Sequence, residues 1–283
     1  MKIKNDTVDM ISSYLGNHPF LQEFGQMHIL IQDILKQLPV EASDLPFTKE
    51  CEENFAEGLP LLQNENWQML LCLPVMQMVQ KLAKQLAGAE VPENLQGFCR
   101  TLSVYLNENE SEPLFFSVIR QQDDVLLEQA GALGLHAQII AYLTWLSLTH
   151  ILSFYREEMD SWRKDRSWEC NYCPVCGSLP SMAQLKKVNH GSDRYLVCTN
   201  CHTEWKYKRL GCAYCSNEEL EKLQILESEE EPQVRLDICT ECQSYIKTYV
   251  EEGQEAVYLE DWATLHLDML AAEQGFKKQG LSE

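Results

Sequence analysis

Eight cysteines arranged as four Cys-x-x-Cys pairs carry most of the chemistry that this 283-residue sequence offers. A Cys-x-x-Cys turn places two sulfurs on one edge of a tetrahedron, and a second such turn supplies the opposite edge around Zn²⁺ or iron. The pairs are Cys173/Cys176, Cys198/Cys201, Cys212/Cys215 and Cys239/Cys242. We therefore expect two metal ions, each held by four thiolates. The spacing alone does not distinguish iron from zinc.

The pairs form an internal repeat of roughly 40 residues. Between the pairs of the first unit lie 21 residues, and between those of the second lie 23, so each unit has room for one β-hairpin. Gly177 follows the first unit's opening pair, where the turn favours a positive φ. The other pairs are followed by His202, Ser216 and Gln243, so a glycine is not general at this position.

Metal is the expected use of these cysteines, in preference to disulfides. Residues 1–20 contain no apolar run and no small-residue cleavage site, which predicts that the chain stays in the reducing cytoplasm, where structural disulfides are rare. Cys170 could compete with Cys173 as a ligand. Three further cysteines, Cys51, Cys72 and Cys99, are expected to be buried apolar residues.

No catalytic site is expected. A closed four-sulfur site leaves no open coordination position for a substrate. The sequence also lacks a Walker loop, a Rossmann fingerprint, a nucleophile elbow and a His-Glu-x-x-His motif. The residues therefore indicate a protein that is not an enzyme.

The net charge of the chain limits the kinds of partner that it is expected to bind. With 23 Lys and Arg against 43 Asp and Glu, the net charge is −20, which argues against sequence-independent binding to nucleic acid or anionic lipid. One local group of cations either offsets the negative charge of a metal–thiolate site or forms a docking patch. It comprises Lys186, Lys187, Arg194, Lys206, Lys208 and Arg209.

The periodicity of apolar residues predicts an α+β fold with a helical first half. Helical runs are expected over 20–38, over 67–86, where Pro74 should kink or split the helix, and over 136–162. The uncharged stretch 130–155 is long enough to cross a membrane, but its recurring polar residues favour a buried core helix and no membrane insertion.

Four segments follow from these patterns. The helical domain covers 1–165, and two small β units, each a four-cysteine metal-binding unit, cover 166–210 and 211–250. A C-terminal helix and tail occupy 251–283, with the helix expected over 261–274.

Several motifs resemble the formate dehydrogenase accessory proteins of the FdhE type. They are CPVCGSLP at 173–180, CTNCHTEWKYKRLGCAYC at 198–215, CTECQSYIKTY at 239–249 and DWATLHLDMLAAEQGF at 261–276. The match includes Thr203, Glu204, Trp205, Arg209, Tyr245 and Lys247. The segments HPFLQEF at 18–24 and GLPLL at 58–62 resemble the family more loosely.

The resemblance implies an all-helical N-terminal domain followed by two tandem rubredoxin-like units. It also implies a cytoplasmic maturation protein, chaperone-like or redox-active, that binds the catalytic subunit of formate dehydrogenase. Iron at the four-cysteine sites is what the family suggests, and zinc stays open. Only the eight paired cysteines are assigned a role from the family, as metal ligands.

Two other classes of function remain as alternatives. The first is a zinc-ribbon module of transcription or nucleic-acid binding, against which the net charge of −20 counts. The second is a rubredoxin-like electron carrier. The sequence also leaves the oligomeric state open, including a homo-oligomer.

Overall fold

The structure is a computed structural model that describes residues 12, 15–16, 18–108, 111–229, 231–250 and 257–279. It forms two compact units. The helical unit contains Gln22–Asn54 and Leu61–Arg166, and the cysteine-rich unit contains Phe55–Pro60 and Ser167–Glu283, with a short N-terminal piece in each. Most of 1–17, which supported the expectation of no export signal, lies outside the described residues.

The helical unit is built around α4, which contacts α2, α5, α6 and α8. Its buried stripe (Trp67, Leu71, Val75, Val79 and Leu82) recurs every three or four residues and supplies the centre of this unit's core. The helices are α2 (Gln22–Gln37), α3 (Lys49–Ala56), α4 (Glu65–Leu86), α5 (Glu93–Glu108), α6 (Glu112–Ile119), α7 (Asp123–Ala132), α8 (Ala137–Phe154) and α9 (Arg156–Arg163), with 3₁₀ turns at Pro19–Leu21 and Leu61–Gln63.

Of the two effects expected of Pro74, a kink or a split, the structure excludes the split. One helix runs from Glu65 to Leu86 with Pro74 inside it. Pro74 lies on the exposed side, where water can bond the carbonyl that the proline leaves without an N–H partner. The buried stripe continues on both sides of it, and packing therefore holds the helix together.

By length and composition, α8 is long and apolar enough to cross a membrane. Its 18 residues have a mean hydropathy of 1.3, and 44% of them are buried. Its buried face carries Ile140, Leu143, Ser147, Leu148 and Ile151, and the helix contacts α4, α6 and α7. A single apolar helix packed in this way is typical of a protein core.

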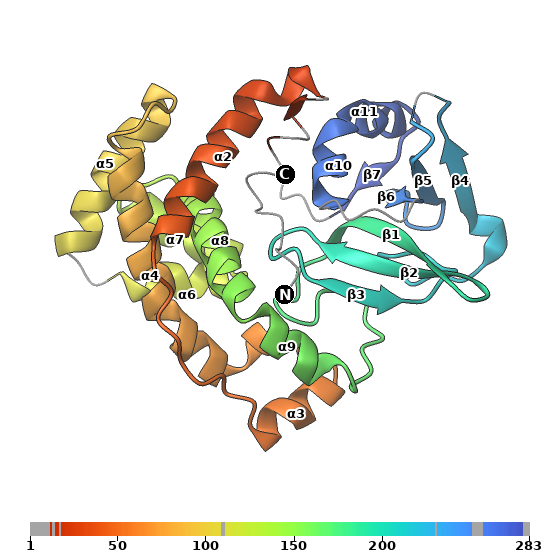
Figure 1. Cartoon of the computed structure of the whole chain (residues 1–283), viewed down its shortest axis with the longest axis horizontal. Helices are drawn as coiled ribbons and strands as arrows, with labels where there is room; N and C mark the ends of the chain where they lie inside the picture. The colour runs from red at the N-terminus through yellow and green to blue at the C-terminus, as the bar shows by residue number, and fades with distance from the viewer. Residues whose placement is uncertain are drawn as a thin grey trace. The chain divides into compact units, whose positions relative to one another are not determined.

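The cysteine-rich unit contains one seven-stranded sheet of order β3-β2-β1-β6-β5-β4, in which β7 also pairs with β6 (Figure 1). Its strands are β1 (Pro180–Val188), β2 (Gly191–Cys198), β3 (Glu204–Tyr207), β4 (Leu223–Glu227), β5 (Val234–Cys239), β6 (Ser244–Tyr249) and β7 (Lys277–Lys278), with a 3₁₀ turn at Leu220–Lys222 before β4.

The sheet displays the repeat seen in the sequence. In each half, a cysteine pair precedes an antiparallel hairpin, the hairpin's second strand ends on the first cysteine of the next pair, and a third strand follows. The hairpins are β1–β2 and β4–β5, and the strands end on Cys198 and Cys239. The halves are joined by parallel pairing of β1 with β6, in which Ala183 lies opposite Thr248.

Two short helices, α10 (Val257–Ala263) and α11 (Leu265–Glu273), occupy the position of the single expected C-terminal helix. They pack on one face of the sheet, where Leu267 and Ala271 join Met182, Leu236 and Tyr249 in a core. The break falls at Thr264, because the Lys247 ammonium donates to the carbonyls of Asp261 (2.8 Å) and Thr264 (3.3 Å). Gly275 follows the end of α11 with φ 85°, a conformation that glycine adopts readily after a helix.

Lys247 is the buried charge that ties these helices to the sheet. Its side chain is 0% exposed, and its Nζ lies 2.7 Å from the Asp261 carboxylate and 2.8 Å from that of Asp268. Tyr245 donates to the same Asp268 carboxylate at 2.7 Å. Burial lowers the pKa of Lys247, and the two carboxylates act in the opposite direction.

We expect Lys247→Met to destabilise the cysteine-rich unit by about 3 kcal/mol, because it leaves the partly buried carboxylates of Asp261 and Asp268 with Lys278 as their one cationic partner among the described residues. Lys206→Met is the control, since its exposed pair with Asp193 contributes no more than about 1 kcal/mol. Urea unfolding of the metal-loaded protein, followed by tryptophan fluorescence, measures both. Equal midpoints for the two variants would contradict this role of Lys247.

Candidate metal centres

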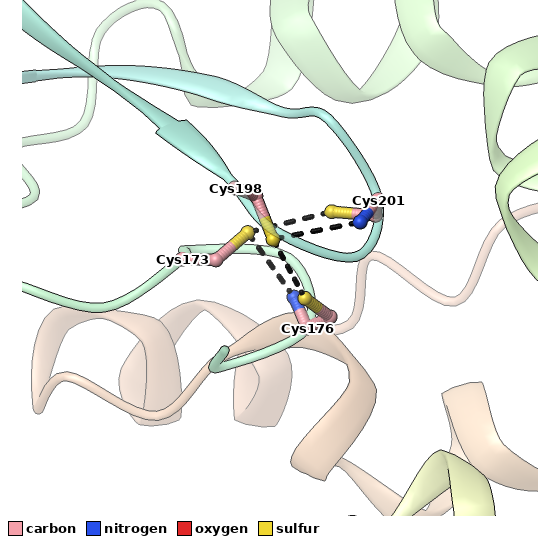
Figure 2. A group of neighbouring side chains, drawn as sticks. All are labelled: Cys173, Cys176, Cys198 and Cys201. Atoms are coloured by element: carbon pink, nitrogen blue, oxygen red, sulfur yellow. Dashed lines mark hydrogen bonds between the residues drawn. The ribbon is translucent and has the colours of Figure 1, made fainter. Parts of the chain in front are cut away.

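The first cysteine group lies where two turns meet, with all four side chains buried (Figure 2). Cys173 and Cys176 come from the loop before β1, and Cys198 and Cys201 come from the end of β2 and the turn after it. The Sγ atoms of Cys173 and Cys201 are 3.5 Å apart, and those of Cys176 and Cys198 are 3.3 Å apart.

The second group repeats this arrangement one hairpin later. Cys212 and Cys215 precede β4, Cys239 ends β5, and Cys242 lies in the turn before β6. The Sγ atoms of Cys212 and Cys242 are 3.6 Å apart, and those of Cys215 and Cys239 are 3.7 Å apart. The structure therefore gathers the eight paired cysteines into two groups of four.

These distances fit a tetrahedral tetrathiolate site. Metal–sulfur bonds of about 2.3 Å place the sulfurs of a tetrahedron about 3.8 Å apart, whereas a disulfide would bring them to about 2.05 Å. All twelve cysteines are free of disulfides. Each group could hold one ion of zinc or iron, which makes two ions in all.

The turns that carry the sulfurs share one backbone conformation. In the first turn the amides of Val175 and Cys176 point at Cys173 Sγ, at 3.4 and 3.5 Å. Equivalent amides point at Cys198 Sγ and Cys212 Sγ. Such N–H donors stabilise a thiolate, because they are aimed at its negative charge.

The residue after each pair has a positive φ, although only one of the four is glycine. Gly177 has φ 85°, His202 55°, Ser216 60° and Gln243 54°. This conformation costs a residue with a side chain about 1–2 kcal/mol. Sequence reasoning did not anticipate it at the three non-glycine positions, since residue type carries no signal there. The recurrence of the Cys-x-x-Cys turn itself was the available clue.

His202 has a second role beside the first group. Its ring stacks on Tyr258 of α10 with centroids 4.1 Å apart and an interplanar angle of 3°. The stacking fixes the turn that carries Cys201 against the C-terminal helical segment. His202 is absent from the cysteine group itself.

Burial alone would keep most of these thiols protonated. It raises the pKa of Cys176 and of Cys198 well above the ordinary value. Burial acts in the same direction on Cys201, but hydrogen bonds with neighbouring cysteines and Thr203 outweigh it and hold the pKa of Cys201 well below that value. A bound cation removes the conflict by stabilising all four thiolates, so metal binding must release protons.

The two groups differ in their access to solvent. The first is buried throughout, and the hydroxyls of Ser178 and Thr203 lie 3.3 and 3.2 Å from the sulfurs of Cys176 and Cys201. In the second, Cys215 is exposed and Cys242 is partly exposed. This difference is not visible in the sequence, where the two units look alike.

The remaining cysteines lie outside both groups. Cys170 is not within the first group, and its thiol instead bonds the Tyr172 hydroxyl, which raises the pKa of Tyr172 to about 12. Burial raises the pKa of both Cys72 and Cys99 to about 11, as expected for inert core thiols. Cys51 is also buried.

Three of the six residues in the local basic group pair with carboxylates. Lys186 pairs with Glu204, Lys206 with Asp193 and Lys208 with Glu218. Arg194 is buried and donates to the carbonyl of Gly211. These lysines therefore do not form a continuous basic patch.

Comparisons with known proteins show what this region is similar to. The family model described as the central domain of FdhE matches residues 172–209, and the one described as its C-terminal domain matches 196–283. A protein FdhE homolog from Aquifex aeolicus is 40% identical over 114 residues, covering 39% of this chain and 40% of that protein. Another from Stutzerimonas stutzeri is 36% identical over 144 residues, covering 50% of this chain and 43% of that protein.

The fold extends the likeness beyond the cysteine-rich unit. The crystal structure of the FdhE protein from Pseudomonas aeruginosa matches 97% of this chain and 91% of its own, with a TM-score of 0.64 at 22% identity. The matches to the two homologs span less than half of those proteins' length, and the structural match shows the fold alone. The expected resemblance to FdhE is confirmed, by sequence over 172–283 and by fold over nearly the whole chain.

We expect a chelator to empty the second group at least about tenfold faster than the first, because ligand exchange begins at an exposed thiolate. Release of metal into a coloured chelator should show two phases in the native protein. Cys212→Ser should abolish the fast phase, and the matched Cys173→Ser should abolish the slow one. A fast phase that survives Cys212→Ser would contradict this order.

Proposed function

We propose that this chain, which carries the central and C-terminal domains of the FdhE family, is a non-enzymatic accessory protein for the maturation of formate dehydrogenase. It acts in the cytoplasm and binds the catalytic subunit of that enzyme. The observation that carries the proposal is the match over 172–283, which contains all eight paired cysteines in two tetrathiolate groups.

The chemistry of the two groups agrees with a role that is not enzymatic. Four protein sulfurs surround each centre and leave no position for a substrate. A bound metal ion would cross-link the two turns of each group and neutralise the thiolate charge. The eight cysteines are the ligands we propose, with iron as the family resemblance suggests or zinc as the equally compatible ion.

A second candidate function, electron transfer, is favoured by one observation. Cys215 and Cys242 reach the surface, so a redox partner could approach the second centre closely. The first centre, with four buried cysteines, has the features of a structural cross-link. The nucleic-acid alternative has no such support, because the net charge is −20 and three of the four lysines near the first centre pair with carboxylates.

We expect an anaerobic pull-down from a host that is making formate dehydrogenase to enrich its catalytic subunit. Cys173→Ser and Cys212→Ser should each reduce the bound metal from two ions to one and lower formate dehydrogenase activity roughly tenfold or more, because a unit without its metal unfolds. Cys99→Ala is the matched control, since it removes a cysteine outside both groups. Full formate dehydrogenase activity with both centres emptied would contradict an essential role for them.

The metal can be identified by its spectrum. Iron in four thiolates should give visible absorption that bleaches reversibly on reduction, and Cys212→Ser should remove about half of it. A colourless protein containing two zinc ions would exclude the electron-transfer role and leave the accessory role intact.

A further inference from the structure

A cavity of about 240 Å³ lies within the cysteine-rich unit, on the sheet beside the second cysteine group. Leu223 and Ile225 of β4 and Ile246 of β6 supply apolar walls. The loop through Gly211 and Cys212 also lines it.

Strand alternation explains which residues meet there. Ile225, Asp237 and Ile246 lie opposite one another across β4, β5 and β6, so their side chains share one face of the sheet. Leu236 and Ile238 alternate with Asp237 on β5 and belong to the core with α11 residues on the opposite face. The cavity therefore occupies the face that α10 and α11 leave uncovered.

Three arginines and one aspartate line the cavity, giving a net charge of three minus one, or plus two. Arg194 is 3% exposed, and the side chains of Arg235 and Asp237 are 13% and 18% exposed. Arg209 is exposed. An excess of cations in such a place is unusual in a chain whose net charge is −20.

The Asp237 carboxylate in the cavity already has a partner at each oxygen. Asp237 accepts a hydrogen bond from the Thr248 hydroxyl at 2.8 Å, and its other oxygen lies 2.9 Å from Arg235 Nε. Arg194 uses one N–H on the carbonyl of Gly211, while its buried Nε has no hydrogen-bond partner among the residues that the structure describes. Each guanidinium has five N–H donors, so donors remain for a ligand.

The neighbouring metal centre accounts for only part of this arrangement. A divalent ion in four thiolates carries two negative charges, which make the buried arginines tolerable before a ligand arrives. No hydrogen bond joins Arg194, Arg209 or Arg235 to a cysteine sulfur within the described chain. The metal centre therefore offsets their charge without using their donors.

The chemistry of the lining selects the ligand. The planar fork of a guanidinium matches a carboxylate in a bidentate manner, and apolar walls favour an apolar body attached to that carboxylate. The arginine excess disfavours cations, and a neutral apolar ligand would leave the donors unpaired. The outer edge of β4 is also open, since β4 pairs with β5 alone among the described strands. An extended peptide could align along that edge.

We propose that this cavity binds a carboxylate carried on an apolar body, with an acidic side chain in an extended apolar peptide as its favoured source. The proposal goes beyond the accessory role and does not depend on it. In this proposal Arg209 and Arg235 bind the ligand's carboxylate, and the more deeply buried Arg194 adds positive charge to the cavity.

Binding of labelled peptides to the metal-loaded full chain tests the proposal. Acetyl-Val-Leu-Glu-Val-Leu-amide should bind about tenfold more tightly than the same peptide with glutamine, because only the first carries the carboxylate. In the second arm, 4-phenylbutyrate should compete with the peptide, and 4-phenylbutyramide should not. Phenylbutyrate binding without peptide binding would support the carboxylate site and assign it to a free organic acid.

Substitutions that should weaken peptide binding, together with one that should tighten it, distinguish an effect on the binding site from misfolding. Arg209→Gln and Arg235→Gln should each weaken binding of the glutamate peptide by about tenfold, whereas Asp237→Asn should tighten it, because a competing carboxylate is lost. Lys187→Gln is the matched control, since it removes one exposed charge outside the cavity and should change nothing. Equal affinities for the glutamate and glutamine peptides, or arginine variants equal to native protein, would overturn the proposal while leaving the formate dehydrogenase pull-down unaffected.

Discussion

Four sulfurs converging on one point is the constraint on which the cysteine-rich unit depends. Within each group the facing sulfurs lie only 3.3–3.7 Å apart, so four thiolates cannot share that space without a cation to balance their charge. Backbone amides aimed at the sulfurs, and three non-glycine residues held at positive φ, are consequences of this geometry. Each hairpin connects the two Cys-x-x-Cys turns of its group, and the four sulfurs determine how those turns are arranged.

Parallel pairing of β1 with β6 converts two similar metal units into one sheet. A continuous sheet has two faces, and here they have different uses. One is covered by α10 and α11, which Lys247 attaches through Asp261 and Asp268. The other holds the arginine-lined cavity. Neither feature belongs to a single repeat, so a protein made of two independent metal ribbons would have neither.

The two repeats hold centres that are not equivalent. The first is enclosed by buried side chains and supported by the hydroxyls of Ser178 and Thr203, whereas the second opens to solvent at Cys215. An enclosed centre suits a permanent cross-link, and an open one suits exchange of metal, electrons or contacts with a partner. The proposed accessory function can therefore assign stability to the first centre and interaction to the second.

The sequence by itself determined the cysteine pairs, the repeat, the hairpins between the pairs and the likeness to FdhE, because each is carried by residue types at short fixed spacings. It also located the main helices through their apolar period. It did not locate the division of the run expected over 136–162 into α8 and α9 at Tyr155, or the division of the C-terminal helical segment at Thr264. Only the tertiary structure decided that β1 joins β6, that Cys215 is exposed, and that Arg194 and Arg235 meet beside Asp237. These features join residues far apart in the chain, and their exposure and partners depend on how the strands assemble rather than on any local pattern.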